Sequence, residues 1–311
     1  MQMKKNTKGF YAGIDSGGTK CEILITDSDK KIIYKNSFKG IHYSVAGVKV
    51  YSDTVSGYII SAFKKCNLIL KDCNGIGLGI AGAREESDRN KLQNGFRKNL
   101  GVKNIYVYSD AMTALYGAFE GKDGIILISG TGSVLYGLAD GKITRIGGWG
   151  RIIGDEGGGY WIGKRALNLL VKEFDKGKGK DLLFAKSLKK EFNTDKSNIN
   201  DKIFKRSFDI QKITPVVIKS AEAGCKLCLQ VVNEAVKDLT EHITAFLSVT
   251  GIKKKINIAF IGSIIENDNI VSEKLKKEIK KISNIEVVIK KHLPSFGAIL
   301  LISENSTLKL K

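Results

Sequence analysis

The hydrophobic pattern in the middle of the chain predicts a β-hairpin closed by a glycine-rich turn. Four apolar residues, 125–128, indicate a buried strand, and a second apolar strand begins at Val134. The residues between the two strands, 129–133, read SGTGS and force a tight turn. Because glycine lacks a Cβ, the backbone of such a turn can approach a ligand closely. Its amide hydrogens and hydroxyls can point at phosphate oxygens. For one such turn alone, an ordinary glycine-rich hairpin is the alternative.

The same pattern occurs near the start of the chain. An apolar strand at residues 11–14 precedes the turn DSGGT at residues 15–19, and a returning strand follows at residues 21–25. In both copies a further turn leads to a third strand, at residues 31–34 and 142–144. Two such units, about one domain length apart, suggest an internal duplication. If the halves face each other, two phosphate-binding turns meet across one cleft, which would be a nucleotide site.

The periodicity of the remaining chain predicts an alternation of helices and strands. Helical spacing of apolar residues predicts helices at residues 45–66, 85–100, 111–119, 164–174, 214–249, 269–281 and from 294 onward. Short apolar runs predict strands at residues 75–82, 105–108, 256–261 and 286–289. Gly224 is expected to interrupt one long helix, which Thr214 would cap with Pro215 in its first position. Residues 176–212 carry weak signals, with helical pieces at 182–188 and 203–208 around a polar linker.

Small residues predict close packing at two places. The glycines of residues 75–82 permit close approach of either a packed helix or a ligand. Gly297 and Ala298 are small enough for close helix contact, which would suit a hinge between domains.

The composition favours an enzyme with two cores. At 311 residues, with 42% hydrophobic residues and two prolines, the chain is long and apolar enough for two α/β domains. The formal charge of +19 invites a nucleic-acid interpretation, but only seven of the 51 basic residues are arginine, and acidic residues lie among the lysines. Specific nucleic-acid readers depend on arginine and interleaved aromatics. We therefore expect no nucleic-acid partner.

The cysteines and apolar stretches favour a cytoplasmic protein. Cys225 and Cys228 form a single C-x-x-C pair in a helical pattern, with no second pair and no histidine nearby. Zinc normally needs four ligands, so we expect free thiols here. No apolar run approaches membrane-spanning length, and the lysine-rich first residues lack the apolar core of a signal peptide. We expect no membrane partner.

Asp110 is the candidate catalytic carboxylate. It stands where a predicted strand ends and a predicted helix begins, which is where open α/β sheets place their sites. The alternative is that Ser109 or Asp110 only caps the helix, a common role for both residue types. The two roles are compatible, because a helix N-terminus favours the ionised carboxylate that a general base requires.

A glycine-rich stretch at residues 147–163 is the least core-like part of the chain. It contains eight glycines, both tryptophans and an acidic pair. Aromatic rings beside polar groups suit a sugar, whose ring has apolar faces and a hydroxyl rim. A solvated connector is the alternative. A second loop, at residues 40–44, could border the cleft, but its His42 has no partner in the sequence and is interpreted as a loop residue.

Together these residues resemble the superfamily of sugar kinases, heat-shock chaperones and actin. Within it they are similar to the N-acetylglucosamine kinase branch of the BadF/BadG/BcrA/BcrD ATPase-type family. GIDSGGTK and ISGTGS resemble the two phosphate segments, and SDAMTAL resembles the connecting helix with the catalytic aspartate. GGWGRIIGDEGGGYWIG is the most family-specific segment and is similar to the acetylhexosamine-binding loop. The resemblance covers most of the chain.

The resemblance implies an α/β fold of two ribonuclease H-like, actin-like ATPase domains, each a mixed sheet with flanking helices, around a nucleotide and sugar cleft. We expect one domain at residues 1–118, completed by a C-terminal helix at 294–311, and the other at 119–293. The implied activity is an ATP-dependent kinase acting on a hydroxyl of an amino sugar. The expected acceptor is N-acetylglucosamine, at its 6-position, or a related N-acetylhexosamine such as N-acetylmuramic acid. ATP, Mg²⁺ and the sugar are the expected ligands, and we expect a homodimer.

The site residues implied by the resemblance have four roles. Asp110 is the general base, and Asp15 reaches Mg²⁺ through water. The residues expected at ATP are Gly17, Gly18, Thr19, Lys20, Gly130, Thr131, Gly132, Gly262 and Ser263. The residues expected at the sugar are Ser133, Gly148, Trp149, Gly150 and Asp155.

Two positions depart from the family pattern. The loop GIHYSVAG lacks the asparagine that family members commonly use for the sugar, which leaves the identity of the sugar open. Ile261 and Gly262 stand where a glycine pair is common at the adenosine turn, which affects nucleotide affinity at most.

Three other functions stay open at this stage. An ATPase that activates a 2-hydroxyacyl-CoA dehydratase would carry a cysteine beside the second glycine turn, where this chain has Ser129. A non-catalytic sugar sensor would keep the sugar loop but would not need Asp110. A kinase for glucosamine or a muramic-type sugar would differ only in its substrate.

Overall fold

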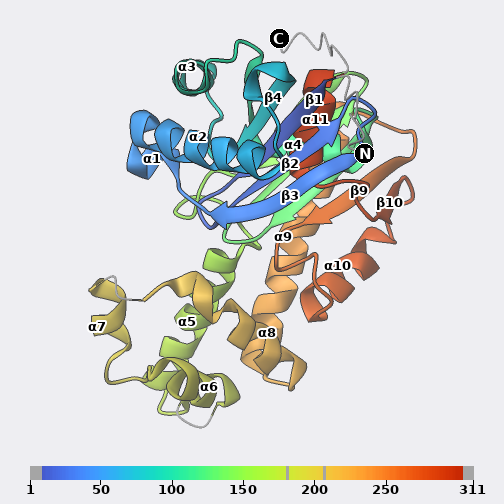
Figure 1. Ribbon diagram of the computed structural model, residues 1–311. Coiled ribbons are helices and arrows are strands. Elements are labelled where there is room, and N and C mark those ends of the chain that lie inside the picture. The colour runs from blue at the N-terminus through green and yellow to red at the C-terminus, as the bar shows by residue number, and fades with distance from the viewer. Residues whose placement is uncertain (1–8, 180–181, 206–207, 304–311) are drawn as a thin grey trace, which may run out of the picture. The chain divides into compact units, whose positions relative to one another are not determined.

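Contacts within the computed structural model divide the chain into two units, each built on its own β-sheet. The structure describes residues 9–179, 182–205 and 208–303. Unit 1 consists of the described residues up to Lys122 and those from Lys290 onward, and unit 2 is Asp123–Ile289. Figure 1 labels the elements of both units in chain order.

The two sheets have the same topology. The strands are β1 (Phe10–Ser16), β2 (Lys20–Asp27), β3 (Ile32–Lys39), β4 (Cys73–Ile80), β5 (Ile105–Ser109), β6 (Gly124–Ser129), β7 (Ser133–Ala139), β8 (Lys142–Gly147), β9 (Ile256–Ile261) and β10 (Ile285–Val288). In the described residues, the strand order is β3-β2-β1-β4-β5 in unit 1 and β8-β7-β6-β9-β10 in unit 2. Each sheet therefore consists of an antiparallel three-stranded meander extended by two parallel strands. This repeat confirms the duplication predicted from the two glycine turns.

In unit 1, helices cover both faces of the sheet. They are α1 (Tyr43–Ala46), α2 (Val48–Lys65), η1 (Leu70–Asp72), α3 (Glu86–Leu100), α4 (Asp110–Phe119) and α11 (Pro294–Ser303). Successive side chains of a strand point to opposite faces. Accordingly, Ile14 of β1 is buried in one cluster with Tyr51 of α2 and Phe96 of α3, whereas its neighbour Gly13 lies against α11.

Helix α11 lies very close to its neighbours because glycines face it. A Cβ added to Gly13 would lie 1.9 Å from the Ser295 carbonyl oxygen, and one added to Gly77 would lie 2.5 Å from a carbonyl oxygen of α11. Gly297, in α11 itself, packs on α4, where an added Cβ would lie 1.9 Å from the Thr113 carbonyl oxygen. The glycine-interrupted strand β4 thus receives a packed helix. The close contact predicted for Gly297 is confirmed within unit 1, and its use as a hinge stays a prediction.

In unit 2, one continuous core joins the sheet to its helices. These are α5 (Gly159–Asp175), α6 (Leu183–Phe192), α7 (Ile199–Phe204), η3 (Ile210–Ile213), α8 (Thr214–Glu222), α9 (Lys226–Thr250) and α10 (Ile270–Ile279). The buried stripe of α9 includes Val232, Leu239 and Phe246, at heptad spacing. Gly137 of β7 makes room for it, since a Cβ there would lie 2.3 Å from the Phe246 ring. No helix among the described residues has the length and apolarity to cross a membrane.

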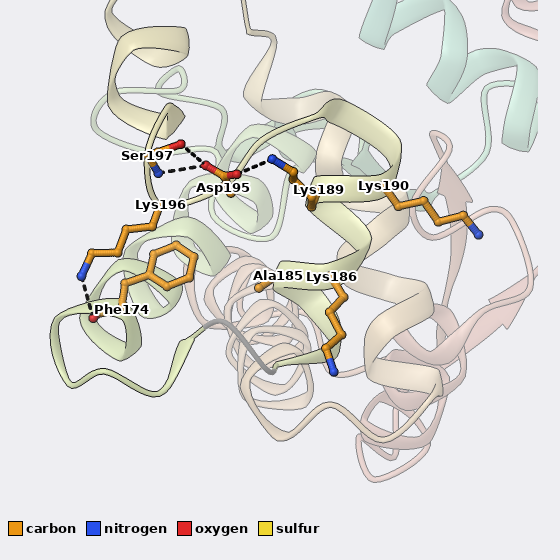
Figure 2. A pocket seen from close by; sticks show the side chains of 8 residues that line it. All are labelled: Phe174, Ala185, Lys186, Lys189, Lys190, Asp195, Lys196 and Ser197. Atoms are coloured by element: carbon orange, nitrogen blue, oxygen red, sulfur yellow. Dashed lines mark hydrogen bonds and ion pairs between the residues drawn. The ribbon is translucent and has the colours of Figure 1, made fainter.

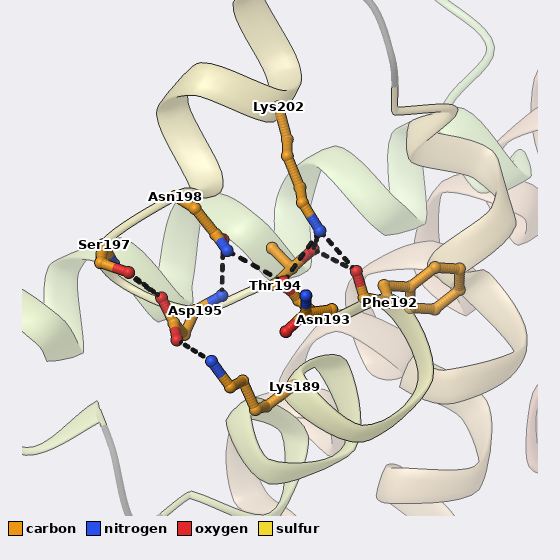
Figure 3. Close-up of polar contacts among 8 residues, drawn as sticks. All are labelled: Lys189, Phe192, Asn193, Thr194, Asp195, Ser197, Asn198 and Lys202. Atoms are coloured by element: carbon orange, nitrogen blue, oxygen red, sulfur yellow. Dashed lines mark hydrogen bonds and ion pairs between the residues drawn. The ribbon is translucent and has the colours of Figure 1, made fainter.

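Lysines between α5 and η3 cap the ends of neighbouring helices. Lys196 Nζ donates to the carbonyl oxygen of Phe174, at the end of α5, over 3.0 Å. Lys202 Nζ donates to the carbonyl oxygens of Phe192 and Asn193 at the end of α6, over 2.6 and 2.8 Å (Figure 3). The last carbonyls of a helix have no partner inside the helix, and its C-terminus attracts positive charge. These contacts explain how a segment with weak sequence signals forms helices.

Several element boundaries differ from the predictions. The predicted helix 45–66 is divided at Gly47, whose φ of 80° ends α1 and lets α2 begin afresh. Helix α5 begins at Gly159 rather than at residue 164, so Trp161 lies in a helix and packs on the core of unit 2. Helix α7 occupies part of the predicted polar linker. Positions 206–207 of the predicted piece 203–208 and 304–311 of the last predicted helix lie outside the described residues.

The long helical tract from residue 214 is interrupted as predicted but is not capped as predicted. Gly224, with φ of 87°, separates α8 from α9. Thr214 is already helical, and its hydroxyl donates to the Gly159 carbonyl oxygen over 2.8 Å instead of capping α8. The predicted cap is wrong because the Thr214 hydroxyl makes its hydrogen bond with the carbonyl oxygen of a residue that is distant in the sequence.

Candidate active site

The first glycine turn joins β1 to β2 in unit 1. Gly17 N donates to the carbonyl oxygen of Lys20 over 2.9 Å and closes the turn, while Gly18 and Thr19 remain exposed. The following loop supports the turn from behind. Gly40 N donates to the Thr19 carbonyl oxygen over 3.1 Å, and a Cβ on Gly40 would lie 2.3 Å from Lys20 N. The turn is therefore held in place by the fold while its tip faces outward.

Lys20, expected at the nucleotide, is bound to a neighbouring carboxylate in this structure. Its Nζ lies 2.9 Å from Glu22 Oε2. Glu22 Oε1 in turn accepts a hydrogen bond of 2.8 Å from Ser295 Oγ at the start of α11. Glu22 therefore ties the turn to α11.

Asp110 begins α4 directly after β5 ends. The Ser109 hydroxyl is the helix cap, accepting from Met112 N over 3.3 Å. Asp110 Oδ1 accepts from Ala111 N over 2.9 Å. Because Ser109 does the capping, Asp110 is not required for it. The position predicted for this carboxylate is confirmed, and its catalytic role stays a prediction.

Two carboxyl groups of unit 1 hold protons more strongly than usual. Burial, together with the negative charges of Asp110 and Glu22, raises the pKa of Asp15 to about 7. Burial also raises the pKa of Asp110, although the Ala111 amide hydrogen bond acts in the opposite direction. Shifted carboxyl groups that influence each other in this way favour acid–base or cation-binding chemistry.

Two further residues belong to this group and were not assigned to it from the sequence. Arg84 and His42 both oppose the rise in the pKa of Asp110. The His42 ring lies beside the first turn and the end of β4, since Cβ atoms added to Gly18 and Gly82 would lie 3.6 and 3.2 Å from it. The residues around His42 in the sequence do not predict this position, because the loop at residues 40–44 comes next to the first turn only when the chain folds.

The second glycine turn joins β6 to β7 in unit 2. The start of α5 holds it, because Gly159 N donates to the Gly130 carbonyl oxygen over 2.7 Å. Thr131 is exposed at its tip. Ser133, expected at the sugar, is buried, and its Oγ donates to the Glu156 carbonyl oxygen over 2.6 Å. In this structure that hydroxyl ties the turn to the glycine-rich loop, residues 148–158 between β8 and α5.

Asp155 brings the second turn and the glycine-rich loop together. Its Oδ1 accepts from Gly150 N over 3.0 Å, and a Cβ on Gly132 would lie 2.2 Å from its Oδ2. Asp155 has a left-handed backbone with φ of 59°. Such a conformation costs a non-glycine residue about 1–2 kcal/mol, and strain of this kind clusters at functional sites. Residues expected at phosphate and at sugar are thus adjacent here.

The glycine-rich loop presents an aromatic ring to solvent. Trp149 is 69% exposed, and the Arg145 guanidinium carbon lies 4.9 Å from the centroid of its ring. Gly148, with φ of 71°, brings the backbone against Val134, where a Cβ would lie 2.8 Å from the valine side chain. An exposed indole on a backbone held in this way can stack against a sugar ring.

A pocket of about 530 Å³ lies beside the second turn, within unit 2. Gly130 and Thr131 form one side, and Ser263, after β9, forms another. The preceding Gly262 has φ of 100°, and a Cβ there would lie 2.4 Å from the Ser129 carbonyl oxygen. The pocket has the size of small-molecule sites, about 300–1,000 Å³.

Most of the pocket wall was missed from the sequence. It comes from α8 and from the polar run after Gly262, namely Pro215, Ile218, Lys219, Glu222, Asn267, Asp268 and Asn269. The polar residues 267–269 could have indicated a binding site from the sequence. The residues of α8 that line the pocket could not, because they are spaced like residues that face a core.

A larger hollow of about 650 Å³ lies beside α5 and α6 (Figure 2). It contains none of the predicted site residues. Two of its lysines already have partners, because Lys189 pairs with Asp195 and Lys196 binds the Phe174 carbonyl. These lysines have a structural role.

Among the described residues there is neither a metal-binding cluster nor a disulfide. Its described residues contain no group of three or more histidines, cysteines, aspartates or glutamates placed to hold a metal ion. Cys225 and Cys228 are buried free thiols at the start of α9. Burial raises the pKa of Cys228.

Comparison with known proteins gives consistent matches over nearly the whole chain. A sequence model of the BadF/BadG/BcrA/BcrD ATPase family matches residues 12–301. The chain is 31% identical to the N-acetylmuramic acid/N-acetylglucosamine kinase of Clostridium acetobutylicum, over 94% of this chain and 97% of that protein. It is 27% identical to the N-acetyl-D-glucosamine kinase of Dictyostelium discoideum, over 95% of this chain and 98% of that protein.

A solved structure shares the fold. A protein of Chromobacterium violaceum provisionally named an N-acetylglucosamine kinase matches with a TM-score of 0.76 and 22% identity, over 96% of this chain and 99% of that chain. The predicted fold class, two mixed sheets with flanking helices of the sugar-kinase type, is thereby confirmed.

Proposed function

Because the chain belongs to the BadF/BadG/BcrA/BcrD ATPase family, we propose that it is an ATP-dependent kinase that phosphorylates a hydroxyl of an amino sugar. The acceptor is N-acetylglucosamine, at its 6-hydroxyl, or a related N-acetylhexosamine such as N-acetylmuramic acid. One observation carries the reaction type: both sheets contain the same strand–glycine turn–strand unit, and unit 1 adds the carboxylate of Asp110 at a helix start. The sugar class is supported by the names of the similar kinases.

Each unit supplies one phosphate-binding turn on this proposal. Backbone amides at the turn tips and the exposed hydroxyls of Thr19 and Thr131 donate to the ATP phosphates. The pocket beside the second turn holds the adenosine, with Pro215 and Ile218 offering apolar surface. Phosphoryl transfer requires positioning and charge stabilisation more than covalent chemistry from the protein.

Asp110 accepts the proton of the attacking sugar hydroxyl. Its raised pKa makes it a better proton acceptor than an ordinary aspartate. The positive charges of Arg84 and His42 act against that rise in the pKa and favour the ionised form that accepts the proton. The sugar is bound by the glycine-rich loop, with Trp149 against its ring and Asp155 holding the loop.

The residues of unit 1 fit a magnesium ion bound through water. Mg²⁺ prefers oxygen ligands, keeps several waters and often uses only one or two carboxylates beside substrate phosphates. Asp15 offers such a carboxylate. Burial and the negative charges of Asp110 and Glu22 raise its pKa to about 7, against the opposing positive charges of Lys20 and Lys290. When bound with ATP, Mg²⁺ would neutralise charge on the phosphates.

Removal of the metal is expected to stop the reaction. Chelation with EDTA should abolish ADP formation, and added Mg²⁺ should restore it. Asp15→Asn should raise the Mg²⁺ concentration for half-maximal activity about 10-fold, in line with the loss of one charge-assisted contact. Asp53→Asn, a matched change on the exposed face of α2, should leave the Mg²⁺ dependence unchanged. Identical Mg²⁺ curves for Asp15→Asn and wild type would remove Asp15 from this role.

A panel of amino sugars tests the proposed function directly. We expect ADP release from ATP and Mg²⁺ to require N-acetylglucosamine or N-acetylmuramic acid, with glucosamine and N-acetylmannosamine as comparison substrates. Release without any sugar would favour an ATPase of the activator type. Sugar binding without ADP release would favour a sensor. The cytoplasmic location and the homodimer stay predictions.

A further inference from the structure

Arg145 is held over the glycine-rich loop by two contacts. It lies on β8, and its Nε donates to the Gly147 carbonyl oxygen over 3.0 Å. Its guanidinium carbon lies 4.9 Å from the centroid of the Trp149 ring. A guanidinium stacked on an aromatic ring is held in place with little loss of its donors. The side chain is therefore oriented before any ligand binds.

Within the part of the chain that the structure describes, the terminal nitrogens of Arg145 have no carboxylate partner and can bind an anion. In the described ranges, 9–179, 182–205 and 208–303, no ion pair joins Arg145 or Arg151 to a carboxylate. Arg165 provides the contrast within unit 2, because it makes a two-pronged pair with Glu234 over 2.6 and 2.9 Å. The planar fork of arginine matches the two oxygens of a carboxylate. Arg145 offers the two terminal nitrogens of that fork, because its described polar contact, with the Gly147 carbonyl oxygen, uses only Nε.

A second arginine, Arg151, lies on the glycine-rich loop itself and adds positive charge. The Arg151 guanidinium carbon lies 5.3 Å from the centroid of the Tyr160 ring, and Arg151 is exposed. Only seven of the chain's 51 basic residues are arginine, and two of these seven, Arg145 and Arg151, each stack on an aromatic ring at this loop. The carboxylate of Asp155, on the same loop, binds the Gly150 amide through its Oδ1, and no ion pair joins it to either arginine among the described residues.

We propose that Arg145, assisted by Arg151, recognises a carboxylate carried by the sugar. The inference rests on the proposed function and narrows it: the enzyme prefers an N-acetylhexosamine with an acidic ether substituent to its neutral parent. N-acetylmuramic acid, which is N-acetylglucosamine carrying a lactyl ether, has this chemistry. Trp149 binds the sugar ring, and the guanidinium beside it binds the carboxylate. Arg145 is thus a specificity-determining residue.

The test compares kcat/KM for three acceptors: N-acetylmuramic acid, its methyl ester and N-acetylglucosamine. The ester keeps the size of the substituent and removes its charge. Wild-type enzyme should prefer the acid to the ester, and Arg145→Gln should lower kcat/KM for the acid by about 10- to 100-fold, the value of a charge-assisted pair. The same variant should change kcat/KM for the ester and for N-acetylglucosamine much less. Lys142→Gln, on the same strand and exposed, should change none of the three.

The possible results distinguish a failure of the role proposed for Arg145 from a failure of the proposed kinase function. If wild-type enzyme phosphorylates N-acetylglucosamine but treats acid and ester alike, Arg145 does not select for charge and the inference is overturned. An equal decrease in kcat/KM for all three acceptors in Arg145→Gln would also overturn the inference. That result would mean that Arg145 only holds the Trp149 ring in place. No turnover of any acceptor would overturn the proposed function itself, and the inference with it.

Discussion

Replacement of Asp110 by asparagine is expected to lower kcat by about 10²- to 10⁴-fold, the usual contribution of a general base. Asparagine has the shape of aspartate and can still accept the Ala111 amide hydrogen bond, but it cannot take the proton of a sugar hydroxyl. The fold should not change, because the Ser109 hydroxyl caps α4. The KM for the sugar should stay near the wild-type value, since binding does not require proton transfer.

Ser109→Ala is the matched control for this variant. It removes the cap and should cost about 0.5–2 kcal/mol of stability, while turnover stays much closer to wild type than in Asp110→Asn. Steady-state kinetics and thermal unfolding of both variants separate capping from catalysis. A turnover close to wild type in Asp110→Asn would remove this carboxylate from the role of base.

Substitution of Gly297 by alanine is expected to destabilise unit 1 by on the order of 3 kcal/mol, at the upper end of the usual cost of overpacking. The added Cβ would lie 1.9 Å from the Thr113 carbonyl oxygen and 2.4 Å from Gly117 N. Both are backbone atoms of α4 and cannot rotate away as a side chain can. Helices α4 and α11 would have to separate, which would disturb Asp110 at the start of α4.

Gly57→Ala, in α2 of the same unit, is expected to leave the stability unchanged or to raise it. Apart from the adjacent residues and the backbone of α2 itself, no atom of the described residues lies within 4 Å of a Cβ added there. Alanine in a helix is about 0.5–1 kcal/mol more favourable than glycine. Urea unfolding should therefore show a lower midpoint for Gly297→Ala and an equal or higher midpoint for Gly57→Ala. If Gly297→Ala is as stable as the wild type, the close contact between α4 and α11 is not the constraint described here.

The parts of the fold that depend on local pattern could be predicted from the sequence. The apolar runs around Gly18 and Gly132 predict two hairpins, and each is present with the expected turn. The repetition of that pattern predicts the duplication, which the shared strand order confirms. The break at Gly224 and the junction at Asp110 follow from local residue chemistry in the same way.

The parts that depend on distant contacts could not be predicted. Thr214 has the sequence of a helix cap but binds the Gly159 carbonyl 55 positions away. Trp161 follows a glycine run and is predicted in the loop, yet α5 begins early enough to pack it, partly buried, against the core. His42 lies beside the first turn, where the preceding Gly40 packs closely against Lys20. In each case tertiary packing determined the environment of a residue whose neighbours in sequence were uninformative.

The central claim is that the protein transfers phosphate from ATP to a sugar hydroxyl. Phosphorus NMR of a mixture of enzyme, ATP, Mg²⁺ and N-acetylglucosamine follows that transfer directly. The account predicts a sugar phosphate monoester that grows in step with ADP and is nearly absent with Asp110→Asn. ADP accompanied only by inorganic phosphate, at a rate that does not depend on the sugar, would contradict it.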